Sequence, residues 1–491
     1  MGYDVAIIGG GVVGAAFARA LSRYRVDAVL LEREAEVGFG TSKANSGIIH
    51  AGWHAPVGSV RGPLEWDGNQ LWGPLQAELG FGFRRVGELI VGFDEEHLAT
   101  LRGLLRQGEE RGVTGLEMWD GDRVRREEPN LSDDIVGALW APTAGVVNPY
   151  EAALLLAESA ARNGVTIRTG RRVTALEPSA EGWTLETSDG TFRARFVVNA
   201  AGRFADEVAA MAGVGEFTIT PRKGEEYLLD KRLAGIVGRI VAPCPTQKTK
   251  GVLVIPTVDG ATMVGPTADD VDDKEDLATS AEGMWRVFEG ARRIVPGLST
   301  RDVIASFSGL RPVADTNDFI IGPTAAPGFI NAAGIQSPGL TSSPAIAELL
   351  LGHLAEAGLE LTPREDFVPT LPHPVHVAGL TRAEHARLAA EDPAFARLVC
   401  RCEVVTEGEV VDAIRRGAWT LDGVKFRTRA GMGRCQGGFC TWRVMRLLAS
   451  ERGVALEEVT KRGGDSWLVY PRDDGGGDRA SGGSPAASAP R

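Results

Sequence analysis

Residues 3–14 read YDVAIIGGGVVG, and this stretch decides the fold of the N-terminal part of the chain. Tyr3 to Ile8 is a mostly apolar run with the length of a buried strand. Three glycines follow, and the small and apolar residues from Val12 to about Tyr24 predict a helix. Asp27 to Leu31 predicts the next strand. The order strand, glycine turn, helix, strand predicts a βαβ unit, so a parallel sheet begins at residue 3.

The glycine turn matches the fingerprint of a dinucleotide-binding site. Gly9, Gly11 and Gly14 occupy the three positions of the GxGxxG pattern. The first glycine permits the tight turn, the second lets the backbone approach a pyrophosphate, and the third allows close packing of the helix on the sheet. Glu32 ends the second strand, where it can accept hydrogen bonds from a ribose. We therefore expect a dinucleotide at this edge of the sheet.

Later segments predict returns to the same sheet, separated by insertions. The strands expected there are Thr166–Leu176, Trp183–Thr187, Phe196–Asn199 and Phe329–Ala332. Prolines between Thr362 and Val375 indicate a linker, and the Gly-, Ser- and Pro-rich C-terminus predicts a disordered tail. The expected layout is a discontinuous dinucleotide-binding domain (1–82, 146–215 and 309–360), an inserted α+β substrate domain (83–145 and 216–308), a linker (361–379), a small C-terminal domain (380–470) and the tail (471–491).

Composition excludes some functions. The 491 residues carry a net charge of −12, which argues against nucleic acid as a partner, because such binders concentrate positive charge. No apolar run approaches the roughly 18 residues that span a bilayer, and the N-terminus lacks the pattern of a signal peptide. We expect a cytoplasmic protein without a transmembrane segment, compatible with peripheral association with a membrane through a partner.

The cysteines indicate a metal site. Cys400, Cys402, Cys435 and Cys440 fall within 41 residues, whereas Cys244, between two prolines, is expected to be a loop thiol. Such local spacing suits a metal better than disulfides scattered through a secreted protein. The spacing itself leaves zinc and an iron–sulfur cluster both open.

Four motifs carry a resemblance over about residues 1 to 360. They are DVAIIGGGVVG (4–14), TSKANSGIIHAG (41–52), VVNAAG (197–202) and GIQSPGL (334–340). Together they resemble the FAD-dependent enzymes of the glycerol-3-phosphate dehydrogenase and D-amino-acid-oxidase superfamily. The resemblance implies an α/β, Rossmann-like FAD-binding domain with the α+β substrate domain inserted into it. The cofactor contacts that it implies are Gly9, Gly11, Gly14 and Glu32 for adenosine and pyrophosphate, Ser42, Asn45, Ser46 and His50 near the isoalloxazine, the backbone of Val173 at the adenine, and Gly202, Gly334, Gln336, Gly339 and Leu340 along the rest.

The C-terminal motifs resemble a second family. CRCEVVTEGEV (400–410) and KFRTRAGMGRCQGGFC (425–440) are similar to the bacterioferritin-associated-ferredoxin type of [2Fe-2S] domain, in particular the copy fused to the catalytic subunit of anaerobic glycerol-3-phosphate dehydrogenases. The resemblance implies that the four clustered cysteines ligate a [2Fe-2S] cluster. Between Cys400 and Arg443, eight basic residues stand against five acids, and this surplus lowers the cost of burying an anionic cluster.

Three residues are candidates for the substrate chemistry. Arg311 resembles the arginine that relatives use to bind a substrate phosphate or carboxylate, which a guanidinium fork suits. His50 is the leading candidate for the general base or a flavin contact, and Tyr227 is a weaker one. A structural role is the alternative for each of them.

The expected function is that of an FAD-dependent dehydrogenase. A small anionic hydroxylated substrate gives electrons to FAD, and the [2Fe-2S] cluster passes them to a second redox subunit, either a flavoprotein or a quinone-linked one. Glycerol 3-phosphate ranks first as substrate. A 2-hydroxy acid similar to 2-hydroxyglutarate ranks second, because KANSGIIHAG and GWHAPVGS look closer to those enzymes, and an amino acid or amine ranks third. A non-enzymatic redox carrier is the remaining alternative.

Overall fold

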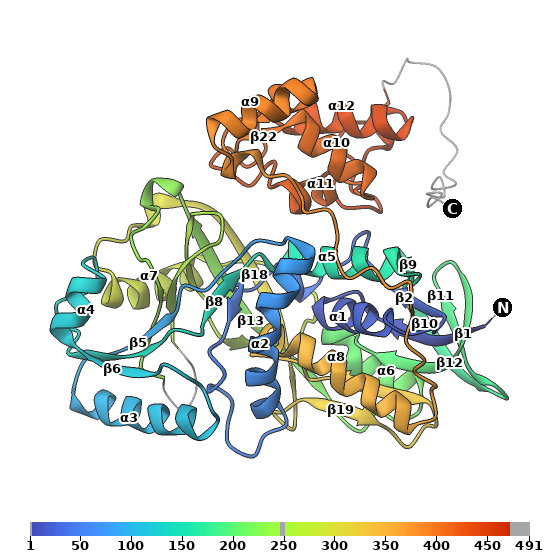
Figure 1. The fold of residues 1–491 in the computed structure, drawn as a ribbon, viewed down its shortest axis with the longest axis horizontal. Coiled ribbons are helices and arrows are strands. Elements are labelled where there is room, and N and C mark those ends of the chain that lie inside the picture. Colours follow the sequence, from blue (N-terminus) through green and yellow to red (C-terminus); the bar gives the residue numbers. More distant parts are fainter. Residues whose placement is uncertain (1, 246–250, 472–491) are drawn as a thin grey trace.

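A computed structural model describes residues 2–245 and 251–471. Two mixed sheets with their helices form the body of the molecule, and a small, mainly helical C-terminal domain lies against it above helix α5 (Pro149–Arg162) (Figure 1). The expected tail falls outside the described residues, apart from its first residue. No helix in the described ranges is both long and apolar enough to cross a membrane.

The first sheet is the one that begins at Tyr3. A parallel core is formed where β1 pairs with β2 and β12, β2 with β9, and β12 with β20. An antiparallel hairpin extends one edge, and β19 pairs with β20. The spatial order is β10 (Val173–Ser179), β11 (Gly182–Thr187), β12 (Gly190–Asn199), β1 (Tyr3–Ile8), β2 (Ala28–Leu31) and β9 (Thr166–Arg168), with β20 (Phe329–Ala333) and β19 (Ile320–Pro323) on the branch from β12.

Helices cover this sheet, and small residues let these helices pack closely on one another. Helix α1 (Val12–Leu21) packs against both α5 and α8 (Gly339–Glu356), and α8 packs against α2 (Arg61–Leu79). Nine of the ten residues of α1 are buried. The N-terminus of α1 points at the carboxyl edge of the parallel strands, where the ligands of such sheets bind.

The second sheet lies in the part of the chain expected to form the substrate domain. Its strands are β17 (Asp269–Asp270), β13 (Ile219–Leu229), β16 (Thr262–Gly265), β15 (Leu253–Pro256), β14 (Ile240–Pro243), β5 (Glu88–Gly92), β7 (Gly137–Ala141) and β6 (Glu117–Asp120), with β18 (Val303–Ala314) paired to β13. Helices α3 (Glu95–Glu110), α4 (Gly121–Glu127) and α7 (Ala281–Ile294) accompany it (Figure 1). Strand β18 runs across the boundary expected at residue 309, because its pairing with β13 continues without a break to Ala314.

A three-stranded sheet joins the two parts of the body. It consists of β3 (Ile48–Ile49), β8 (Gly145–Val147) and β4 (Phe83–Arg84). The chain after β3 enters the loop of His50, so this small sheet holds that loop between the two large sheets.

The linker lies along the part of the body that contains the first sheet. Arg25 N–H donates to Thr362, Arg364 N–H donates to Arg23, and Leu371 N–H donates to Glu78. The C-terminal domain that follows contains α9 (Arg382–Glu391), β21 (Leu398–Cys400), β22 (Val405–Thr406), α10 (Glu407–Arg415), α11 (Leu421–Thr428) and α12 (Thr441–Arg452) around one apolar core.

Candidate functional site

A cavity of about 670 Å³ opens at the carboxyl edge of the first sheet and reaches the second sheet. The elements that wall it are the glycine turn, the segment after β2, strands β13 and β18, and the start of α8. The predicted residues that line it are Gly9, Gly11, Glu32, Ser42, Asn45, Ser46, His50, Val173, Gly202, Arg311, Gln336, Gly339 and Leu340. Three predicted residues, Gly14, Tyr227 and Gly334, are absent from its wall.

The glycine turn leaves the space that a pyrophosphate requires. A Cβ built on Gly11 would meet only the hydroxyl of Ser42, at 3.3 Å, so it would project into the open cavity. That hydroxyl accepts a hydrogen bond of 2.8 Å from Val12 N–H, at the positive end of helix α1. The turn therefore offers a helix N-terminus and bare backbone to an anion, which fits the diphosphate of FAD.

The other glycines of the fingerprint act on packing. Gly9 has φ +108°, a conformation that L-residues rarely adopt, and a Cβ on Gly14 would clash with the carbonyl oxygen of Gly9. Gly14 thus meets the expectation of close helix packing without touching the cavity. Gly334 has φ +66°, and it turns the chain into the wall formed by residues 335–341.

Glu32 sits at the floor of the same region. Its carboxylate accepts hydrogen bonds from Gly10 N–H at 2.7 Å and from Glu34 N–H at 2.8 Å. Burial raises the pKa of this carboxyl, and the two backbone donors oppose that shift. Glu32 therefore lies at the cavity wall beside the turn, as expected for a residue that meets a ribose.

Strand β13 decides which side chains reach the substrate end. Arg222, Gly224 and Glu226 alternate along the strand and line the cavity. Tyr227 points to the opposite face, where it is fully buried, its hydroxyl donates to Glu225 at 2.7 Å, and its ring packs against Phe288. The expectation for Tyr227 near the substrate is not met, because the period of two along a strand gives that position to its neighbour.

Glu226 is a site residue that the sequence did not single out. Its side chain is 3% exposed, and its carboxylate accepts a hydrogen bond of 2.7 Å from the hydroxyl of Ser46. Burial raises its pKa to about 7, opposed by the Ser46 hydrogen bond and by the charge of Arg311. The only signal in the sequence was the pair Glu225-Glu226, which does not reveal which acid faces the cavity.

Arg311 brings a positive charge to the same wall. Its Nη2 donates to the carbonyl of Thr267 at 2.6 Å, and burial lowers its pKa, opposed by the charge of Glu226. On the paired strand, Gly224 leaves room for the guanidinium, since a Cβ there would lie 2.6 Å from Nη2. Arg61, at the start of α2, adds a further guanidinium that the motifs did not indicate.

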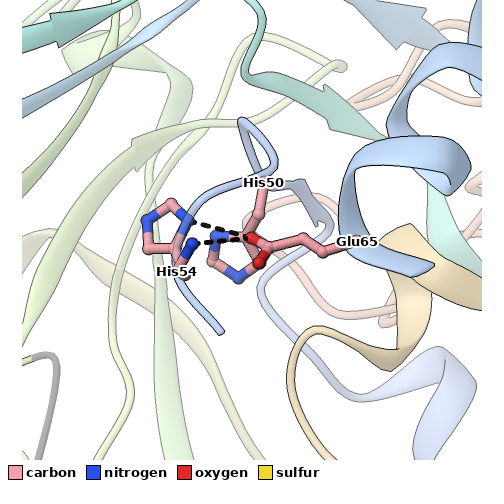
Figure 2. A group of neighbouring side chains, drawn as sticks. All are labelled: His50, His54 and Glu65. Carbon is pink, nitrogen blue, oxygen red and sulfur yellow. Dashed lines mark hydrogen bonds and ion pairs between the residues drawn. The ribbon is translucent and has the colours of Figure 1, made fainter. Parts of the chain in front are cut away.

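His50 lies in this part of the cavity with a second histidine beside it (Figure 2). The rings of His50 and His54 are 4.5 Å apart, and Nε2 of His50 lies 3.4 Å from the hydroxyl of Ser337. The backbone of His50 is held on both sides, since its N–H donates to Thr341 at 2.9 Å and its carbonyl accepts from Asn69 at 2.7 Å.

His54 is set between two buried acids. Its Nδ1 lies 3.0 Å from Glu65, and its Nε2 lies 3.2 Å from Glu88. The ligand atoms of His50, His54 and Glu65 fall within 4.8 Å of one another, a spacing that a metal ion could use. The carboxylate of Glu65, however, also accepts from Ala55 N–H at 2.9 Å, so it fixes the backbone of this loop.

The four predicted cysteines converge in the C-terminal domain. Sγ of Cys402 and Sγ of Cys435 are 3.6 Å apart. A hydrogen bond from Cys440 lowers the pKa of Cys400 to about 5, assisted by backbone N–H groups of Gly431, Glu403 and Cys402. Such a set of four thiols with backbone donors aimed at a thiolate fits a cluster with Cys₄ ligation. Cys244 follows the end of β14 outside any helix or strand, as its flanking prolines suggested, and its side chain is buried in an apolar cluster.

Arg429 ties this centre to the body of the molecule. It contacts Glu403 at 2.9 Å, beside Cys402, and Asp259 at 2.6 Å, and it donates to the hydroxyl of Tyr150 at 2.8 Å. The same hydroxyl lies 3.5 Å from the sulfur of Met432. The cysteine centre therefore sits next to the interface with the FAD side.

Phe426 brings the same interface close to the cavity wall. Its ring packs against Phe39 and Tyr150, and the ammonium of Lys43 lies over it. Lys43 follows Ser42 and precedes Ala44, both of which line the cavity. One short segment thus touches the cavity on one side and the C-terminal domain on the other.

Comparison with known proteins agrees with both halves of the chain. Residues 4–351 match the FAD dependent oxidoreductase family, and residues 398–450 match the BFD-like [2Fe-2S] binding domain. The chain is 43% identical to a glycerol 3-phosphate dehydrogenase of Caloramator mitchellensis, over 95% of this chain and 98% of that protein. It is 27% identical to a subunit of the anaerobic glycerol-3-phosphate dehydrogenase of Escherichia coli K12, over 91% of this chain and 88% of that protein.

A solved structure matches the body alone. The L-alpha-glycerophosphate oxidase of Mycoplasma pneumoniae with FAD bound superposes with a TM-score of 0.73 at 31% identity, and the match covers 76% of this chain and 99% of that one. The predicted fold, flavin and cluster are thereby confirmed. The chain belongs to the FAD-dependent oxidoreductase family, and it carries a C-terminal BFD-like [2Fe-2S] domain.

Proposed function

We propose that this protein oxidises glycerol 3-phosphate to dihydroxyacetone phosphate and passes the electrons through its [2Fe-2S] cluster to a second redox subunit. The observation that carries the proposal is the match to a glycerol 3-phosphate dehydrogenase along almost the whole of both chains. The cavity supports it, because a buried cation and a histidine face the same space.

Arg311 is the residue that binds the substrate phosphate. A guanidinium presents two parallel N–H donors to an oxyanion, and burial strengthens that interaction. One Nη2 donor is already directed to Thr267, which orients the fork. Arg61, on the same cavity wall, adds positive charge.

His50 accepts the proton of the substrate hydroxyl at its Nε2. Thr341 and Asn69 fix its backbone, and Ser337 lies at the ring, so the imidazole keeps its direction toward the cavity. FAD, when bound, takes the hydride from the carbon that bears this hydroxyl. Glu226 is uncharged below a pH of about 7, so it does not repel the anionic substrate there.

The C-terminal domain favours a dehydrogenase over an oxidase. The oxidase structure matches 76% of this chain, whereas the two glycerol 3-phosphate dehydrogenase relatives match 95% and 91% of it, including the cysteine region. An oxidase returns electrons to oxygen at the flavin, so it has no use for a cluster. The cluster supports delivery of single electrons to a partner. The Escherichia coli relative is named as one subunit of its enzyme, which supports assembly with further subunits.

A 2-hydroxy acid is the second candidate substrate. The fork of Arg311 fits a carboxylate as well as a phosphate, and His50 serves the same hydroxyl chemistry. Reduction of the bound flavin separates the candidates. Under anaerobic conditions, sn-glycerol 3-phosphate should bleach the flavin absorption, whereas 2-hydroxyglutarate and glycine should not. If 2-hydroxyglutarate alone bleached the flavin, the substrate would be a 2-hydroxy acid and not glycerol 3-phosphate.

A further inference from the structure

Large apolar side chains stand in solvent around the cysteines. Phe439 is 84% exposed and Trp442 is 54% exposed, while Leu398 and Val404 are about 40% exposed. Each of them lies within two residues of a cluster cysteine. Contiguous exposed apolar side chains mark interaction sites, because it is favourable to remove them from water by binding a partner.

The two segments that carry these side chains are joined next to the cysteines. Cys400 and Cys440 are buried, whereas Cys402 is exposed and Cys435 is half-buried. A backbone hydrogen bond from Phe439 reaches the thiol of Cys435. Arg443 donates to the carbonyl of Leu398 at 2.9 Å, which joins α12 to the strand that precedes Cys400. Exposed apolar side chains thus accompany the cysteines on both segments that carry them.

The same segments carry positive charge. Arg401, Arg443 and Arg446 are exposed, and Arg446 lies one helical turn after Trp442 on α12. The acids nearest in sequence are engaged elsewhere, since Glu403 is buried against Arg429 and Glu407 pairs with Arg397. Aromatic residues and arginine are the types that dominate binding energy in protein interfaces.

We propose that the cluster-edge surface, formed by Leu398, Arg401, Val404, Phe439, Trp442 and Arg446, docks an acidic redox protein that carries a one-electron acceptor near its own surface. The inference rests on the proposed electron exit through the cluster and adds where, and with what chemistry, the acceptor binds. One electron leaves the reduced cluster, the acceptor is reduced by that electron, and no bond forms or breaks. Opposite charge steers the encounter, and the aromatic side chains are buried in the complex.

The chain uses the same complementarity where this domain meets the body of the molecule. There Arg416 meets Glu158, Arg427 meets Glu36 and Arg434 meets Asp230. Those arginines are consumed by the body of the molecule, whereas the basic residues of the cluster-edge surface are left for an external partner. A second copy of this chain is the competing occupant, because its net charge of −12 makes it an acidic protein as well.

The test uses the full-length holoenzyme, reduced anaerobically with dithionite and mixed with a one-electron haem protein. The soluble domain of cytochrome b5 is the acidic probe, and cytochrome c is the basic control. We expect faster reduction of cytochrome b5, a rate constant that falls as salt is added, and binding of oxidised cytochrome b5 in surface plasmon resonance. The double variants Phe439→Ser/Trp442→Ser and Arg401→Glu/Arg446→Glu should each lower the rate constant and the affinity by about tenfold or more.

Matched controls alter an exposed aromatic and a basic residue of the body, Trp285→Ala on α7 and Arg106→Glu on α3, which lie away from the C-terminal domain (Figure 1). They should leave both readouts unchanged. Wild-type cluster absorption in each variant shows that the domain is folded. If the aromatic variant is not folded, the charge-reversal variant tests the proposal.

Wild-type rates in the folded variants, or a preference for cytochrome c, would overturn the proposal. If the wild type sedimented as a dimer and the aromatic variant as a monomer, the occupant of the surface would be a second copy of this chain and not a redox partner. A further outcome is that glycerol 3-phosphate fails to reduce the flavin while dithionite-reduced enzyme still reduces cytochrome b5. That result would support the docking surface and contradict the proposed substrate.

Discussion

Nη1 of Arg427, in the C-terminal domain, lies 2.8 Å from the carboxylate of Glu36, in the FAD-binding domain, and both side chains are buried. Arg427 also approaches Glu158 at 3.5 Å. A Cβ on Gly423 would clash with Glu36, so the domains meet there without spare room. The pair fixes the domain that carries the cluster against the segment that borders the flavin.

Replacing Arg427 by alanine should detach this contact. The change leaves a buried carboxylate without its partner, which costs on the order of 3 kcal/mol or more. Denaturant unfolding should show the loss, and the double variant with Glu36→Ala should recover much of it. The control is Arg415→Ala, because Arg415 pairs with Glu451 at the surface and should cost less than about 1 kcal/mol. Equal costs at the two sites would contradict the assignment of Arg427.

Gly11→Val should yield a folded protein without FAD. The added side chain presses only on the Ser42 hydroxyl and otherwise enters the open space where the pyrophosphate would lie. Gly14→Val should instead lower the folded yield, since its Cβ meets the backbone of Gly9. Flavin absorption per folded protein, with circular dichroism as the check on folding, distinguishes the two. Full FAD occupancy in Gly11→Val would show that the turn is not the binding site.

Arg311→Lys should raise KM for glycerol 3-phosphate by about tenfold or more, while FAD content is retained. A point charge replaces a bidentate fork, and lysine cannot both donate to Thr267 and hold the phosphate in the same plane. Initial rates with an artificial electron acceptor measure KM. An unchanged KM would remove Arg311 from the substrate site.

Glu226→Gln should remove a pH dependence. The folded pKa of about 7 exceeds the usual carboxyl value of 4.5, so the protonated form is favoured by folding. The stability linked to this group is present below pH 4.5 and is lost as the pH rises through 7, on the order of 3 kcal/mol in all. The glutamine variant should keep that stability at pH 8, and its KM should not rise above pH 7 as that of the wild type does. Parallel pH profiles of the two proteins would refute this role.

Cys400→Ser should abolish the cluster but spare the flavin chemistry. A serine hydroxyl replaces the buried thiol whose pKa is held at about 5, so one ligand is lost. Iron content and the visible absorption of the cluster should fall, while glycerol 3-phosphate still bleaches the flavin. Cys244→Ser is the control, because Cys244 packs in the substrate domain. Retention of iron by the Cys400 variant, or zinc in the wild type, would contradict the cluster assignment.

Local motifs were enough for the cofactors. Gly9 to Gly14 and Glu32 belong to one βαβ unit, and the cysteines form two short pairs, so neighbours in sequence stay neighbours in space. The expected strands of the first sheet also appear, and β11 lies close to its expected bounds, but the single strand expected at Thr166–Leu176 is two strands, β9 and β10, at opposite ends of the sheet order. Such features depend on short-range geometry, which a sequence pattern records directly.

The substrate end and the domain interface were decided by the tertiary structure. Glu226 and Tyr227 are adjacent, and only the pairing of β13 with β18 tells which of them faces the cavity. Arg427 and Glu36 are 391 residues apart, and the burial that makes their pairing specific arises only when the domains pack. A pattern of residue types carries neither the face of a strand nor a contact between distant segments. Both follow from how the buried surfaces fit together.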